Sequence, residues 1–305
     1  MRPYVSIIVP TYNSELTISQ CLSSLLRLDY WKFQIIVVDD GSSDKTKSIL
    51  ETYTRKDKRL SVIYLNKAGI SASRNAGVRK SKGDIVIFID SDCIADTDLL
   101  NKIAGIFSKN DELKVVSGGK KTWNSKNDVA NFVGYQLEHA YLEVMGKNLP
   151  YTPTHLCACK RDVFKKIIFD ERIKRPSFED VKFGDEACKI FQVRFFGNLS
   201  IWHVNPPTAS EFFRHIFVQF YGQFLYQKEK LQAKQYFIFP MLFWTFLTSL
   251  QIPIPFFLIK KRAPLRLLIK APAFICVQNF ALTIAFITFL KDSFRNRYKV
   301  FEVTP

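Results

Sequence analysis

The sequence predicts an α/β fold with a mixed, mostly parallel sheet flanked by helices, followed by C-terminal membrane helices. Two observations support this. Short apolar runs alternate with amphipathic helical patterns through the first 120 residues, and two long uncharged segments lie near the C-terminus. Strands that alternate with helices are typical of parallel sheets, because each helix carries the chain back to the edge where the next strand begins.

Continuous apolar runs such as Ile35–Val38 are typical of strands that are covered on both faces. Five runs predict strands, at residues 5–9, 35–38, 60–65, 85–89 and 115–116, the last closed by Gly118-Gly119. Helical patterns lie between these runs and begin at Ser14, at Asp44, after Gly69 and at Asp98. We expect Ser14 and Asp44 to cap their helices through their side-chain oxygens.

Composition excludes several protein classes. A chain of 305 residues that is 47% hydrophobic is not disordered, and 12 Gly and 6 Cys exclude collagen and small disulfide-rich proteins. The cysteines form no CxxC pair, so we interpret them as structural thiols in a reducing compartment. The net charge of +16 favours an anionic partner, which could be nucleic acid, a phosphorylated small molecule or a membrane surface.

The C-terminal part favours a membrane over nucleic acid. Residues 236–259 and 271–290 carry no charge, and about 20 apolar residues span a bilayer. Basic residues flank both segments, and Arg266 and Lys270 are among those expected in the loop between them. We expect a hairpin of two spans, although prolines inside the first segment leave re-entrant or interfacial helices as alternatives. The domain prediction is a catalytic domain over 1–205, an amphipathic interface helix over 206–235 and a membrane region over 236–305. No nucleic-acid recognition motif is present.

Two acidic clusters follow predicted strands. Asp39-Asp40 comes after one strand and Asp90-Ser91-Asp92 after another, so both lie at the edge where ligands bind in parallel α/β sheets. Paired carboxylates suit Mg²⁺ or Mn²⁺ that also holds a diphosphate. An acid in the position of Asp40 can accept hydrogen bonds from a nucleotide base or ribose. Arg74 offers planar donors to a phosphate or to an acidic side chain.

Four motifs occur in order: Val5–Asn13, Val37–Asp44, Arg74–Gly77 and Asp90–Asp92. Together they resemble family 2 glycosyltransferases of the GT-A fold, over about residues 4–205. The resemblance implies a nucleotide-sugar donor, either a UDP- or a GDP-sugar, and a divalent metal, Mn²⁺ or Mg²⁺. It also implies inversion at the anomeric carbon.

The resemblance implies roles for individual residues. Donor-binding residues would be Pro10, Tyr12, Asp40, Arg74 and Asp90, where Asp90 contacts the ribose or the sugar. Asp92 would contact the metal and the diphosphate. His203, after Ile201-Trp202, would approach the metal or the diphosphate, with packing beside Trp202 as the alternative. His155 would line the acceptor site.

The resemblance leaves two candidates for the catalytic base, which takes a proton from the acceptor hydroxyl. The family has an acidic pair before a helix, and this sequence offers Glu179-Asp180 and Asp185-Glu186. The spacing from Gly184 to Gly197 favours the second pair and makes Glu186 the base, with Asp185 beside it. Asp180 is the base if the first pair is the motif. Glu186 and Gln192 depart from the usual Asp and Arg.

The functional prediction is a membrane-attached glycosyltransferase that modifies a lipid-linked or glycan acceptor during glycan or polysaccharide biosynthesis. The N-terminus shows no signal-peptide pattern, so we expect the catalytic domain on the cytoplasmic side of the cell membrane. The Gln-x-x-Arg-Trp signature of processive synthases is absent, which favours the addition of one sugar at a time. The alternatives are a polyprenyl-phosphate sugar synthase and a non-catalytic, membrane-bound scaffold.

Overall fold

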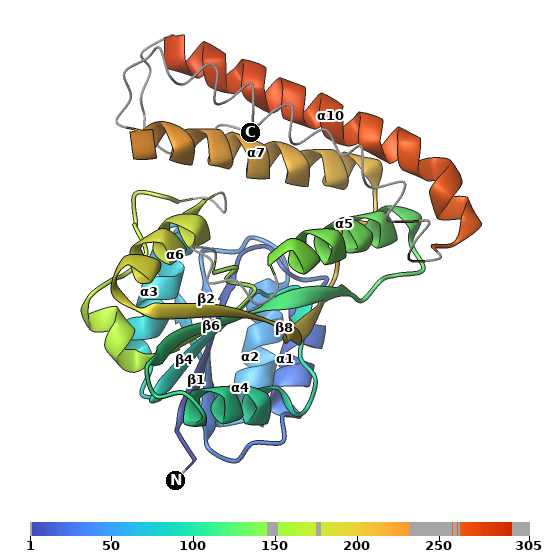
Figure 1. Cartoon of the computed structure of the whole chain (residues 1–305). Helices are drawn as coiled ribbons and strands as arrows, with labels where there is room; N and C mark the ends of the chain where they lie inside the picture. The colour runs from blue at the N-terminus through green and yellow to red at the C-terminus, as the bar shows by residue number, and fades with distance from the viewer. Residues whose placement is uncertain are drawn as a thin grey trace. The chain divides into compact units, whose positions relative to one another are not determined.

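The computed structural model describes residues 2–144, 152–174, 178–231, 258, 261 and 263–294 (Figure 1). The chain divides into two compact units. The first comprises Met1–Trp123, Tyr141–Arg175 and Glu179–Val204, and the second comprises Asn124–Ala140, Pro176–Phe178 and Asn205–Pro305. Residues 124–140 thus group with the C-terminal residues. The predicted division into a catalytic domain, an interface helix and a membrane region stays a prediction.

The first unit is built on an eight-stranded mixed sheet with the order β3-β2-β1-β4-β7-β6-β8-β5. The strands are β1 (Val5–Thr11), β2 (Phe33–Asp39), β3 (Leu60–Tyr64), β4 (Ile85–Ile89), β5 (Cys93–Ile94), β6 (Leu113–Thr122), β7 (Leu156–Lys160) and β8 (Gln192–His203). Strands β1 to β4 are mutually parallel, β7 runs antiparallel between β4 and β6, and β8 is parallel to β6. The C-terminal ends of β1, β2, β3, β4, β6 and β8 therefore share one edge, hereafter the catalytic edge.

Side-chain alternation along the buried strands creates two cores. Ile7 and Val37 pack in the core with α1 (Ile18–Leu26), α2 (Thr46–Lys56) and α4 (Leu99–Ser108). Ile8 and Phe88 point to the other face, which is covered by α3 (Ile70–Lys80) and α6 (Glu179–Ile190) (Figure 1). Because successive strand residues point to opposite faces, an unbroken apolar run is what a sheet between two helix layers requires. The predicted fold class is confirmed.

One predicted strand end is wrong. Strand β6 continues through Gly118-Gly119 to Thr122, and its register against β8 shifts at these glycines. A Cβ atom on Gly118 would lie 2.4 Å from the carbonyl oxygen of Leu199. The glycines thus allow β8 to approach closely and do not end the strand.

The two predicted caps have different outcomes. Asp44 Oδ1 accepts a hydrogen bond from the backbone N–H of Thr46 at 3.0 Å, at the start of α2. Ser14 does not cap α1, which begins at Ile18. The Ser14 hydroxyl instead lies 2.9 Å from the Ser91 hydroxyl, so it links the loop after β1 to the loop after β4.

Helix α3 packs closely on β1, and this contact gives a prediction. A Cβ atom on Gly77 would lie 2.4 Å from Cγ2 of Ile8, whereas on Gly105 of α4 it would meet no atom of the described residues within 4 Å. We expect Gly77→Ala to lower the free energy of unfolding by about 1–3 kcal/mol through overpacking. Gly105→Ala is the matched control and should raise it by about 0.5–1 kcal/mol through helix propensity. Urea unfolding measures both, and equal effects would contradict the packing argument.

The second unit contains α7 (Ala209–Leu231), α10 (Leu265–Phe294) and most of α5 (Asp128–Val144). Helices α7 and α10 run side by side (Figure 1). Aromatic rings join the three helices. The ring centroid of Phe132 in α5 lies 6.0 Å from that of Phe212 in α7 and 5.3 Å from that of Phe274 in α10. Packing within this unit therefore accounts for part of the apolar face that suggested an interface helix over 206–235, and membrane contact by that helix stays a prediction.

The basic residues before the second predicted span belong to α10. Arg266 and Lys270 were expected in the loop between two spans, but they occupy the first turns of this helix and pair with Asp128 at 2.9 and 2.8 Å. Within the described residues, one helix is long and apolar enough to cross a membrane, Leu265–Phe289, with a mean hydropathy of 1.7. The predicted span 236–259 lies almost entirely outside the described residues.

Candidate active site

The loops at the catalytic edge have unusual backbone conformations. Asn13 after β1, Gly41 after β2 and Lys67 after β3 have positive φ angles of 49°, 78° and 50°. Non-glycine residues adopt such angles only when their surroundings hold them there, and such residues cluster at functional sites. The edge that holds the predicted donor motifs is therefore also the strained part of the sheet.

Asp40 shapes the loop that precedes α3. Its two carboxylate oxygens accept hydrogen bonds from the backbone N–H groups of Ala68 at 2.7 Å and Gly69 at 2.8 Å. Of the other predicted donor residues, Pro10 is buried in β1, and Tyr12 is 50% exposed just beyond it. Asp40 therefore has a structural partner on each oxygen.

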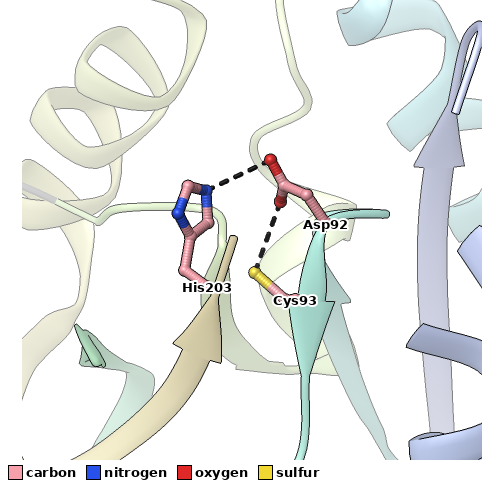
Figure 2. A group of neighbouring side chains, drawn as sticks. All are labelled: Asp92, Cys93 and His203. Atoms are coloured by element: carbon pink, nitrogen blue, oxygen red, sulfur yellow. Dashed lines mark hydrogen bonds and ion pairs between the residues drawn. The ribbon is translucent and has the colours of Figure 1, made fainter. Parts of the chain in front are cut away.

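Asp92, immediately before β5, meets His203, the last residue of β8 (Figure 2). The Nε2 atom of His203 lies 3.1 Å from Oδ2 of Asp92, and the Cys93 thiol lies 3.6 Å from Oδ1. One ligand atom from each of these three residues lies within 4.8 Å of the others, which is close enough to share a metal ion. Antiparallel pairing of Cys93 with His203 brings the two chain segments together.

The cluster favours a charged carboxylate and a neutral thiol. Burial disfavours the charge on Asp92, but His203 outweighs that effect and lowers the pKa of the carboxyl group below its usual range. Burial raises the pKa of the Cys93 thiol well above its ordinary value, and the carboxylates of Asp92 and Asp90 add to the effect. Asp92 thus offers a charged carboxylate and His203 an imidazole nitrogen, and the Cys93 sulfur is the third ligand atom of the cluster.

Arg74 joins the loop after β4 to the start of α6. Its guanidinium donates to Glu179 Oε1 at 2.7 Å and to Asp90 Oδ1 at 3.4 Å, and only 3% of the side chain is exposed. The ring of Phe169 packs against the guanidinium at 5.4 Å. Burial disfavours the cation, but Glu179 and Asp90 raise the pKa of Arg74 above its ordinary value. The sequence predicted that Arg74 binds either a phosphate or an acidic side chain, and in the structure its partners are the acidic side chains of Glu179 and Asp90.

Asp180 follows Glu179 in the first turn of α6. Burial raises its pKa to about 7, the Glu179 carboxylate adds to the effect, and the Arg74 guanidinium opposes it. Asp90 also raises this pKa, so the two carboxylates are within electrostatic reach of each other. A carboxyl group that titrates near neutrality in a cleft is a candidate general base.

The second acidic pair lies further along the same helix. Asp185 and Glu186 are partly buried, and the Asp185 carboxylate lies 4.0 Å from Lys189. Since α-helical residues advance by about 100° each, Asp185 and Glu186 lie roughly 140° and 240° around the helix from Asp180. Asp180 and Glu186, the two candidate bases, therefore lie on different faces of the helix.

The family profile of Glycosyl transferase family 2 matches residues 6–168, which is more than half of the chain. The chain belongs to glycosyl transferase family 2. This is a family of transferase enzymes, and the matched region contains the four motifs at the catalytic edge.

Individual relatives agree with this assignment. The uncharacterized glycosyltransferase EpsJ of Bacillus subtilis (strain 168) is 35% identical over 138 residues, covering 45% of this chain and 39% of EpsJ. The match thus spans about two fifths of the relative. Mannosyltransferase PcManGT from Pyrobaculum calidifontis, in complex with GDP-Man and Mn²⁺, superposes with a TM-score of 0.66 at 17% identity, covering 96% and 88% of the two chains. Staphylococcus aureus TarS 1-349 with UDP-GlcNAc gives 0.54 at 18% identity, covering 99% and 94%.

His155 is a buried, neutral histidine. Its Nε2 atom lies 3.0 Å from the carbonyl oxygen of Gly118, and 5% of the residue is exposed. Burial lowers its pKa well below the ordinary value, and Lys120 and His203 act in the same direction. His155 thus links the start of β7 to β6, and its role at the acceptor stays a prediction.

Several residues at the site were not predicted from the sequence. Glu179 was noted only as the neighbour of a possible base, yet it is the buried partner of Arg74. Cys93 was counted among structural thiols, and its closeness to Asp92 and His203 depends on strand pairing. Trp123 follows β6 directly and is 51% exposed. An aromatic residue next to a strand end at the catalytic edge was the available signal.

Proposed function

We propose that this protein is a metal-dependent, inverting glycosyltransferase that moves a sugar from a nucleotide-sugar donor to a membrane-associated acceptor. The observation that carries the proposal is the ion-pair network of Arg74 with Asp90 and Glu179, next to which lies the Asp180 carboxyl group, whose pKa burial raises to about 7. This network lies at the catalytic edge, where Asp92 and His203 form the second part of the site.

A nucleotide diphosphate is the donor group that suits this edge. Two solved structures with the same fold are complexes with GDP-Man and with UDP-GlcNAc, so either base is compatible with the architecture. We infer that Tyr12 and the loop held by Asp40 contact the nucleoside. Arg74 acts through Asp90 and Glu179, because its buried guanidinium is already paired with both.

The residues at Asp92 fit a divalent metal. Asp92 offers a charged carboxylate and His203 an imidazole nitrogen, while the protonated Cys93 thiol makes a zinc site less suitable. Carboxylate with open positions for phosphate oxygens is the usual protein contribution to a Mn²⁺ or Mg²⁺ site. Asp92 and His203 would hold the ion, which neutralises negative charge on the leaving diphosphate when bound.

Asp180 is the base that the geometry favours over Glu186. Its pKa near 7 makes it about half deprotonated at neutral pH and still basic enough to accept a proton in the transition state. The acceptor oxygen loses its proton to Asp180 and bonds to the anomeric carbon, while the bond from that carbon to the diphosphate oxygen breaks. Attack opposite the leaving group inverts the anomeric configuration.

The acceptor is proposed to lie near the cytoplasmic face of the membrane. The apolar stretch Leu265–Phe289 supports membrane attachment by its length and composition. A lipid-linked glycan or a growing surface polysaccharide would then reach the catalytic edge. The first alternative is a polyprenyl-phosphate sugar synthase, whose product would release its sugar in mild acid because the sugar is attached to one phosphate.

Nucleotide binding tests this proposal. We would titrate UDP, GDP and CMP into the full-length protein in detergent, with and without Mn²⁺, by calorimetry. We expect one nucleotide to bind in a Mn²⁺-dependent manner and Asp92→Asn to weaken it by at least about tenfold, as the loss of a metal-site residue does. Asp111→Asn is the matched control, because that side chain is 99% exposed. Absence of binding to folded protein would favour the non-catalytic scaffold.

A further inference from the structure

Lys120 lies near the C-terminal end of β6, on the strand that pairs with β8. In the parallel register of these two strands, Lys120 lies opposite Ile201, two residues before His203. Register partners share a face of the sheet, and residues two apart on one strand point to the same side. Lys120 and His203 are therefore diagonal neighbours on one face, at a separation that a long side chain can reach.

Core packing identifies this face. Ile201 belongs to the same buried core as Cys93, and Cys93 pairs directly with His203 in the sheet. The three side chains thus lie on one side of β8 and β5. Because Lys120 shares the face of Ile201, it lies on the side of the sheet that carries the metal-site cluster of Figure 2.

The next residue along β6 points to the other face. The Lys121 ammonium lies 5.4 Å from the ring centroid of Trp202, which is also its register partner. Lys121 is exposed, whereas Lys120 is partly buried. Two adjacent lysines are therefore separated by the sheet, and only the first shares a face with the cluster.

The charge of Lys120 acts on both carboxylates that follow β4. Burial raises the pKa of Asp90 above its ordinary value, and Arg74 and Lys120 oppose that rise. Burial also disfavours the charge on Asp92, but His203 and Lys120 outweigh it and lower the pKa of this carboxyl group. The ammonium is thus within electrostatic reach of both acids, in agreement with the strand register.

A nucleoside diphosphate brings more negative charge to this edge than one divalent ion neutralises. Arg74 is unsuited to supply the remaining positive charge, because its guanidinium is 3% exposed and paired with Glu179 and Asp90. Lys120 is suited to it, since an ammonium is a compact charge with three donors that binds phosphate oxygens well.

We propose that Lys120 binds the diphosphate of the nucleotide-sugar donor, beside Asp92 and His203. This inference rests on the proposed function and adds a residue to its donor site. The ammonium donates hydrogen bonds to phosphate oxygens and stays beside them while the bond from the diphosphate to the anomeric carbon breaks. Negative charge grows on the diphosphate in this step, so Lys120 stabilises the leaving group as well as the bound donor.

Separate affinities for nucleotides and nucleosides test this role. UDP and GDP would be titrated by calorimetry at saturating Mn²⁺ into the full-length protein in detergent, and uridine and guanosine binding would be followed by ligand-observed NMR. Lys120→Met should weaken diphosphate binding by at least about tenfold, as the loss of a charge-assisted hydrogen bond predicts, and leave nucleoside binding unchanged. Lys120→Arg keeps a cation with phosphate donors and should stay within about threefold of the wild type.

Lys121→Met is the matched control. It removes the same charge one residue away, on the opposite and exposed face of β6, so it should change diphosphate affinity by less than about twofold. If Lys120→Met does not fold, Lys120→Gln removes the charge with a more polar side chain and should show the same loss.

Three results would overturn the inference. These are unchanged diphosphate binding in Lys120→Met, an equal loss in Lys120→Met and Lys121→Met, and a loss of nucleoside binding that matches the loss of diphosphate binding. The last result would mean that Lys120 only maintains the shape of the site. Failure of the wild type to bind UDP or GDP with Mn²⁺ would instead contradict the proposed function itself.

Discussion

Replacing Asp180 by asparagine should lower the rate of sugar transfer by about 10³-fold, the middle of the range for loss of a general base. Asparagine keeps the shape of the side chain but cannot accept the proton of the attacking hydroxyl. Nucleotide affinity should change by less than about twofold, since the role proposed for Asp180 is towards the acceptor and not the nucleotide. Steady-state transfer assays together with calorimetry separate the two effects.

Glu186→Gln is the matched control for this prediction. It removes an equivalent carboxylate from the same helix, on a different face, and should reduce kcat by less than about threefold, as expected for a group outside the proton transfer. The opposite result, with Glu186→Gln inactive and Asp180→Asn active, would restore the assignment that the spacing from Gly184 to Gly197 favoured.

The pH dependence of the transfer rate and of protein stability gives a second test of the role of Asp180. The pKa of Asp180 is raised from 3.8 to about 7 in the folded protein, so transfer by the wild type should decline as the pH falls below about 7. The folded state binds the extra proton between these two values, so this group makes the protein less stable as the pH rises through that window. Asp180→Asn should therefore gain at least about 1 kcal/mol of stability at pH 8 and nothing at pH 4, measured by unfolding.

Replacing Glu179 by glutamine should lower the free energy of unfolding by about 3 kcal/mol, the lower end of the range for a broken buried ion pair. Arg74 and Glu179 are 3% and 5% exposed, and their charged atoms lie 2.7 Å apart. Without the carboxylate, the buried guanidinium keeps only Asp90 at 3.4 Å. Because Asp90 remains as a partner, we expect a loss of unfolding free energy at the lower end of the range.

The exposed pair of Arg55 and Glu51 supplies the control. These side chains are 79% and 46% exposed and 3.9 Å apart, so Glu51→Gln should cost less than about 0.5 kcal/mol. Glu179→Gln should also shift the acidic limb of the transfer rate to lower pH, because the Glu179 carboxylate raises the pKa of Asp180. A normal Tm combined with an unchanged pH profile would show that the pair neither stabilises the fold nor influences the base.

Several features of the fold follow directly from local sequence. The run Ile35–Val38 predicts a strand covered on both faces, and the structure places helices on both sides of β2. Asp44 caps α2 because its oxygen reaches an N–H only two residues away. The order of the four motifs also indicated the family, since each motif follows its strand at the same edge.

Other features depend on contacts between distant segments, and local patterns misjudged them. Gly118-Gly119 was predicted to end a strand, but β6 continues through these glycines, which allow β8 to pack closely against it. Ser14 resembled a helix cap, but Ser91, 77 residues away, is its partner. Arg266 and Lys270 were expected in a loop, but both lie in α10, where they form ion pairs with Asp128.

The sequence by itself determined the alternating α/β layers, the catalytic edge and the family, because these depend on residue spacing along one segment at a time. Only the tertiary structure decided that Arg74 faces Glu179 and Asp90, and that Cys93 joins Asp92 and His203. The proposal that Asp180 is the base also rests on tertiary contacts. Besides its neighbour Glu179, the charges that act on Asp180 are those of Arg74 and Asp90, about 105 and 90 positions earlier in the chain, and spacing within the helix cannot reveal them.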